Sequence, residues 1–144
     1  MGTTAVRFYT GLGDRLGFAA RLLRKACRQG IRADVVGATP ELQRLSRQLW
    51  NLPGFQAHAA PGAPEGQRRR SPIVLATDFA AAAGRPLLLN LTDGLPPDLA
   101  RWAQVIELVS DADEDVQHGR QQFKAYRARG LQPEHLAAGA AGDA

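Results

Sequence analysis

The fold class follows from the N-terminal segment Val6-Arg7-Phe8-Tyr9-Thr10-Gly11-Leu12-Gly13-Asp14, where an alternating apolar stretch runs into a glycine-rich turn. The alternation around Val6 and Phe8 predicts a β-strand that ends at the turn. Asp14 is a typical helix N-cap, and Gly30 is suited to end the helix that follows. The apolar residues at helical spacing between them are Leu16, Ala19, Ala20, Leu23 and Cys27. The chain therefore opens with a strand, a turn and an amphipathic helix.

The same order of elements is repeated downstream. Residues 31–37 predict a second strand, and Thr39-Pro40 begins a second helix because threonine caps a helix and proline fits its first turn. Further buried strands are predicted by the apolar runs 73–76, 87–91 and 105–109, and a last helix begins near Asp111. This alternation indicates an α/β fold with helices packed on a mostly parallel, mixed sheet.

Length and composition suit a single domain. The chain has 144 residues, of which 44% are hydrophobic, enough for one buried core. We expect the α/β domain to span residues 1–131 and the Ala- and Gly-rich residues 132–144 to form a disordered tail. Residues 54–71 are rich in Gly, Pro, Ala and Arg, which predicts a long surface loop.

Several function classes are disfavoured by composition. The single cysteine, Cys27, excludes an intramolecular disulfide and is predicted to be a core residue in a reducing compartment. No apolar run approaches the roughly 20 residues of a membrane span, and the first residues lack a secretory pattern, so we expect a cytoplasmic protein without membrane contact. The histidines His58, His118 and His135 are scattered, so neither a metal nor another cofactor is expected.

Basic and aromatic residues lie side by side in the predicted last helix. Arg120 and Lys124 recur at helical spacing beside an apolar stripe that includes Phe123 and Tyr126 and is expected to face the core. Both cations lie mid-helix, so the helix dipole does not account for them. They would frame a pocket floored by Phe123 and by Val109 of the preceding strand. Such a pocket suits an acidic peptide with an apolar anchor and a carboxylate, which predicts binding rather than catalysis.

Two other features leave alternatives open. The net charge of +4, a basic row on the first helix and Arg68-Arg69-Arg70 would attract phosphates, although basic rows are usually solvated faces. Trp50, Leu52 and Phe55 follow the second helix and form either a hydrophobic plug over the core or an exposed partner-binding patch.

Short motifs recur in a fixed order along nearly the whole chain. They are Phe8-Tyr9, Leu22-Leu23-Arg24-Lys25-Ala26, Leu49-Trp50, Pro72-Ile73, Leu89-Asn90-Leu91 and, most specifically, Arg120-Gln121-Gln122-Phe123-Lys124-Ala125-Tyr126-Arg127-Ala128-Arg129-Gly130. In order and spacing they resemble the chi subunit of bacterial DNA polymerase III holoenzyme. The resemblance implies a three-layer, Rossmann-like α/β sandwich that lacks a functional nucleotide-binding loop. It also implies a non-catalytic accessory subunit of the clamp loader.

The resemblance further implies two binding surfaces. One would bind the acidic C-terminal tail of single-stranded DNA-binding protein, which ends in Pro-Phe, through the positions Val109, Arg120, Phe123 and Lys124. The two cations would meet the terminal carboxylate and acidic side chains, while Phe123 and Val109 would receive the terminal phenylalanine ring. In the family the position of Phe123 is often tyrosine, so a hydroxyl hydrogen bond is lost here.

The second surface would bind the psi subunit, which links chi to the clamp loader. The matching positions are Trp50 and Phe55, and a helicase-like protein is another candidate for the same surface. Contact with DNA would be mainly indirect.

Two rival interpretations come from other classes. The first is a Rossmann-like nucleotide-binding enzyme that uses the turn Gly11-Leu12-Gly13, although the third glycine of the dinucleotide motif is replaced by Leu16. The second is a standalone nucleic-acid-binding protein.

Overall fold

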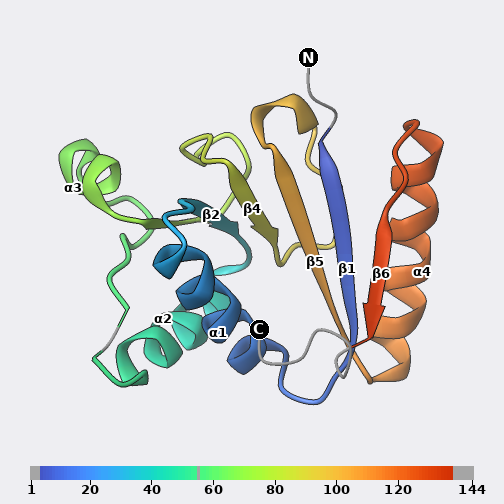
Figure 1. Ribbon diagram of the computed structural model, residues 1–144, viewed down its shortest axis with the longest axis horizontal. Helices are drawn as coiled ribbons and strands as arrows, with labels where there is room; N and C mark the ends of the chain where they lie inside the picture. The colour runs from blue at the N-terminus through green and yellow to red at the C-terminus, as the bar shows by residue number, and fades with distance from the viewer. Residues whose placement is uncertain (1–3, 55, 138–144) are drawn as a thin grey trace.

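A six-stranded parallel sheet lies between two helical layers in the computed structural model, which describes residues 4–54 and 56–137 (Figure 1). In chain order the elements are β1 (Ala5–Leu12), α1 (Arg15–Arg28), β2 (Ala33–Val36), α2 (Thr39–Asn51), α3 (Glu65–Arg70), β3 (Ile73–Ala76), β4 (Leu87–Asn90), the 3-10 turn η1 (Leu99–Arg101), β5 (Gln104–Ser110), α4 (Asp113–Ala128) and β6 (Glu134–Ala137). The strands are ordered β3-β2-β4-β5-β1-β6. The predicted Rossmann-like α/β sandwich is confirmed. Every pairing between described strands is parallel, so the antiparallel strand that a mixed sheet would need does not occur among them.

Helices α1 and α2 cover one face of the sheet, and α4 covers the other. Neighbouring residues of a strand point to opposite faces, so Tyr9 packs with the α1 and α2 residues, whereas Phe8 packs with Tyr126 of α4. Strands β2, β3 and β4 are buried along their whole length. Because both faces are covered, these strands appear in the sequence as continuous apolar runs rather than as alternating ones.

The start of α1 is fixed by the predicted N-cap. The carboxylate of Asp14 accepts a hydrogen bond from the backbone N–H of Gly17 at 3.0 Å. The helix ends at Arg28, and Gly30 follows with a φ of +77°, a conformation that favours glycine. The turn after β1 therefore leads directly into α1 as the sequence predicts.

Two expectations about irregular segments are wrong. The predicted loop 54–71 contains the short helix α3. The predicted disordered tail from residue 132 contains β6, which pairs in parallel with β1 and carries an ion pair between Arg7 and Glu134 at 3.1 Å. Without β6, the backbone groups of β1 on that side would form an unpaired sheet edge. Residues 138–144 lie outside the described part of the chain.

A buried carboxylate fastens the connection between β3 and β4. Asp34, in β2, has an exposed fraction of 0%. It accepts hydrogen bonds from the backbone N–H groups of Ala83, Gly84 and Arg85 and from the indole N–H of Trp102, at 2.9 to 3.0 Å. One strand thereby orders a distant loop and the residue that follows η1.

Candidate functional site

The inner face of α4 is formed by a glycine and two polar side chains. Gly119, Gln122 and Tyr126 are its buried residues, whereas the sequence predicts an apolar stripe. A Cβ atom on Gly119 would lie 2.8 Å from a methyl carbon of Val109, closer than side chains tolerate. The missing side chain therefore lets α4 settle directly on the end of β5.

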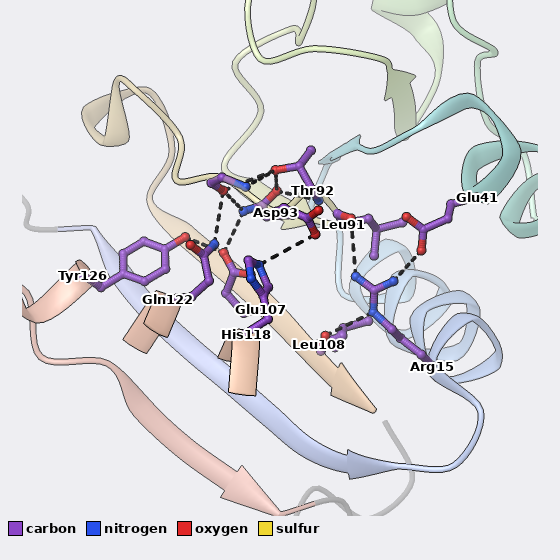
Figure 2. A network of polar contacts seen from close by, with 12 residues as sticks. Arg15, Glu41, Leu91, Thr92, Asp93, Glu107, Leu108, His118, Gln122 and Tyr126 are labelled. Carbon is purple, nitrogen blue, oxygen red and sulfur yellow. Dashed lines mark hydrogen bonds and ion pairs between the residues drawn. The ribbon is translucent and has the colours of Figure 1, made fainter. Parts of the chain in front are cut away.

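A polar network holds the rest of this face to the sheet (Figure 2). The Tyr126 hydroxyl and the Asn90 amide both donate hydrogen bonds to Oε2 of Glu107, the latter at 2.7 Å. The amides of Asn90 and Gln122 also donate to the carbonyl oxygen of Gly94, at 2.8 and 3.2 Å. These bonds join α4, β4 and β5 and set the rotation of the helix about its own axis.

The Glu107 carboxyl lies in the interior, and its protonation is shifted accordingly. Burial raises its pKa from the ordinary 4.5 to about 7, although the hydrogen bonds from Tyr126 and Asn90 act in the opposite direction. Burial, and after it the charge of Glu107, raises the pKa of the Tyr126 hydroxyl, which stays a donor. Glu107 thus holds a proton in the folded protein at pH values where it is ionised in the unfolded chain.

We expect the stability of the protein to depend on pH through Glu107. Because the folded state has the higher pKa, the stabilisation is fully present below about pH 4.5 and is lost as the pH rises through about 7. The loss amounts to about 3 kcal/mol. Replacing Glu107 with glutamine keeps an acceptor oxygen and removes the titration. Urea unfolding between pH 4.5 and 7.5 is expected to show a falling stability for the native protein relative to Glu107→Gln, and two parallel profiles would contradict this role.

A polar cavity of about 260 Å³ opens beside this network, at the edge of the sheet where β4 and β5 end. Arg15 lies in its wall, pairs with Glu41 and donates a hydrogen bond to the carbonyl oxygen of Leu108 at 3.1 Å (Figure 2). Val109 and Gly119 line the same cavity. Arg120, Phe123 and Lys124 are not among its lining residues. Of the four residues predicted for the peptide site, only Val109 lines this cavity.

The outer face of α4 places the predicted residues together. Arg120 and Lys124 are exposed, one helical turn apart, and neither forms an ion pair or hydrogen bond with a described residue. Phe123 is half-buried, and its ring lies 5.2 Å from that of Phe8 in β1. Val109 belongs to the same apolar cluster beneath the helix. A half-buried ring flanked by two uncompensated cations is the result.

The second predicted surface lies at the end of α2. Trp50 is 59% exposed and is the large apolar side chain most open to solvent among the described residues, so it does not plug the core. The His58 ring stands edge-on to it at 5.9 Å and is itself bonded to Ser46 and to the carbonyl oxygen of Gln56. The other predicted residue, Phe55, lies outside the described part of the chain. This surface presents a tryptophan whose position is supported by a fixed histidine.

Comparison with known proteins assigns the chain to a family. The sequence pattern of the family "DNA polymerase III chi subunit, HolC" matches residues 3–134. The chain belongs to this family. No curated protein matches the chain significantly. As a chi subunit, the protein is a replication accessory subunit of DNA polymerase III.

Within this chi subunit the turn after β1 does not favour a nucleotide. In dinucleotide-binding proteins the pyrophosphate lies against the N–H groups at the start of the first helix. Here the Asp14 carboxylate already accepts from Gly17 at that point, so a phosphate would meet a negative charge. Among the described residues no cluster of three potential metal ligands occurs, and no described helix is long and apolar enough to cross a membrane.

Proposed function

We propose that this chi subunit is a non-catalytic adaptor of DNA replication. The outer surface of α4 binds the acidic C-terminal tail of single-stranded DNA-binding protein, and the surface around Trp50 binds the psi subunit of the clamp loader. The polymerase holoenzyme is thereby coupled to coated single-stranded DNA. No covalent bond is formed or broken in this function.

The observation that supports tail binding is the pair of unpaired cations beside a half-buried ring. Arg120 and Lys124 are free of protein partners among the described residues, so an incoming carboxylate does not have to displace an ion pair. Phe123 offers part of its ring surface for an edge or offset contact with a phenylalanine. Val109 is only 7% exposed, so it supports this floor from below.

The two proposed surfaces lie on opposite sides of the sheet. Trp50 belongs to α2, which packs with α1 on one face, whereas Phe123 belongs to α4 on the other face (Figure 1). This placement supports the proposal that one chi subunit holds both partners at once. An adaptor requires this simultaneous binding.

Replacement of Trp50 with alanine tests the adaptor function. We expect it to weaken association with psi by at least about tenfold. Replacing a tryptophan that anchors an interface with alanine typically costs more than about 1 kcal/mol of binding free energy. Binding of the tail of single-stranded DNA-binding protein is expected to stay unchanged. The measurement is gel filtration and calorimetry of the native and variant proteins with each partner and with both together.

Gln48→Ala, an exposed substitution on the same helix, is the matched control. Undiminished psi binding by Trp50→Ala would remove Trp50 from the interface. Mutually exclusive binding of psi and the tail would contradict the adaptor function.

A further inference from the structure

Five arginines gather at the edge of the sheet where β2, β3 and β4 begin. They are Arg32, just before β2; Arg68, Arg69 and Arg70, at the end of α3 before β3; and Arg85, just before β4. Along the strand order, this arginine cluster lies beside the outer strand β3. Helix α4 lies on the opposite side of the sheet, near the other outer strand, β6 (Figure 1). The cluster is therefore separate from the proposed tail-binding surface on α4.

Backbone carbonyl oxygens of this segment accept hydrogen bonds from two of these guanidinium groups. Arg32 donates hydrogen bonds to the carbonyl oxygens of Arg69 and, at 3.1 Å, of Ser71. Arg85 donates to the carbonyl oxygen of Arg68. Basic groups at the carbonyl end of a helix are stabilised by its dipole, which explains part of this arrangement. Carbonyl oxygens carry no net charge, however, so the cluster as a whole is not neutralised.

The nearby carboxylates are already occupied. Glu65 pairs with Arg68 at 3.0 Å. Asp34 accepts from three backbone N–H groups and the Trp102 indole, and it forms no ion pair with Arg85. Among the described residues, Arg68 is thus the one member of the cluster that forms an ion pair.

Arg85 shows the shortage of negative charge in the cluster most clearly. Its exposed fraction is 8%, and its Nη1 atom is buried with no hydrogen-bond partner among the described residues. Burial, and after it the charge of Arg32, lowers the pKa of Arg85. A buried guanidinium that lacks an anion is costly, and buried polar atoms in proteins are nearly always paired. One guanidinium nitrogen of Arg85 therefore lacks an acceptor among the described residues, near the like charge of Arg32.

We propose that the arginine cluster binds the phosphate backbone of single-stranded DNA. Guanidinium groups match phosphate oxygens with paired N–H donors, and a phosphate bound at the exposed Arg32 would place a negative charge near the buried Arg85. The exposed side chains of Arg69 and Arg70 contact the neighbouring phosphates. Because these contacts read only the backbone, binding shows no sequence preference and falls with salt.

DNA is the phosphate source that the surroundings favour. The family works in DNA replication, and several adjacent cations suit a chain of phosphates better than one free anion. With this contact, the chi subunit touches DNA directly while α4 stays open to a protein tail.

The test is fluorescence anisotropy of a labelled oligothymidylate with the full chain alone. We expect Arg69→Ala/Arg70→Ala to lower the affinity by about tenfold at low salt, with a shallower salt dependence than the native protein. The matched control is Arg44→Ala/Arg47→Ala, which removes two exposed arginines of α2 that line a cavity with Gly13 and Ser110, where β1 and β5 end. The affinity of the control variant for the oligonucleotide is expected to fall by less than threefold. An equal loss in both variants, or no binding by the native protein, would overturn the proposal.

A second variant separates DNA from other anions. Arg85→Met removes the buried guanidinium, and we expect it to abolish the rise in melting temperature that inorganic phosphate gives over chloride at equal ionic strength. If Arg85→Met does not fold, the Arg69 and Arg70 variant still decides the matter. Stabilisation by phosphate without oligonucleotide binding would mean a small-anion site, and a loss of acidic-peptide binding in Arg69→Ala/Arg70→Ala would mean a peptide site. Either result would overturn the DNA proposal and leave tail binding at α4 to its own test.

Discussion

Replacing Arg120 and Lys124 together with alanine is expected to weaken binding of the tail of single-stranded DNA-binding protein by about 10- to 30-fold. Each exposed ionic contact contributes up to about 1 kcal/mol, and the two act on the same acidic peptide. The difference from the native protein is expected to shrink as salt is raised, because exposed charges are screened. Calorimetric titration at two salt concentrations measures both effects. The melting temperature is expected to stay the same, since neither side chain has a partner among the described residues.

The control for this experiment removes the same charge from another helix. Arg21 and Lys25 are exposed, four residues apart on α1, and lie on the other face of the sheet. Arg21→Ala/Lys25→Ala is expected to bind the peptide nearly as well as the native protein. An equal loss in both double variants would show that net charge alone attracts the peptide, and it would remove Arg120 and Lys124 from the site.

Replacing Asp34 with alanine is expected to lower the free energy of unfolding by about 3–5 kcal/mol. The change leaves the Trp102 indole N–H and the backbone N–H of Arg85 buried without their acceptor, and it removes the acceptor of the N–H groups of Ala83 and Gly84. It also removes a negative charge near Arg85. Since small domains are stable by only about 5–15 kcal/mol, the variant is expected to be close to unfolding at 37 °C. Urea unfolding monitored by tryptophan fluorescence measures the difference.

Asp34→Asn distinguishes hydrogen bonding from charge. Asparagine keeps one acceptor oxygen but lacks the second one and the negative charge. We therefore expect Asp34→Asn to have a free energy of unfolding between those of the native protein and Asp34→Ala. A loss below about 1 kcal/mol in Asp34→Ala would contradict the idea that this carboxylate fastens the loop before β4.

Local patterns predicted the elements whose signals are local. The cap at Asp14 placed the start of α1, and the apolar runs placed β3, β4 and β5. Helix α3 and strand β6 were missed for a common reason. Each lies in a segment whose composition favours a loop, and β6 is ordered by pairing with β1, more than 120 residues away in the chain.

In the candidate site, too, local features were predictable from the sequence and long-range contacts were not. Exposure of Arg120 and Lys124 follows from helical spacing, which a sequence reveals. The network behind them joins Glu107 to Asn90 and Tyr126, residues that come together only through the sheet order. A signal for it was present, because a charged residue within an otherwise apolar strand needs a buried partner. The sequence alone did not identify that partner.

Calorimetric titration of the native protein with the last residues of single-stranded DNA-binding protein tests the adaptor proposal most directly. The comparison is with the same peptide lacking its terminal phenylalanine. Saturable binding of the full peptide, and its loss on removal of that one residue, is the expected result, since the ring beside Phe123 and the terminal carboxylate near Arg120 act together. Equal affinity for both peptides, or no binding of either, would contradict tail recognition at α4.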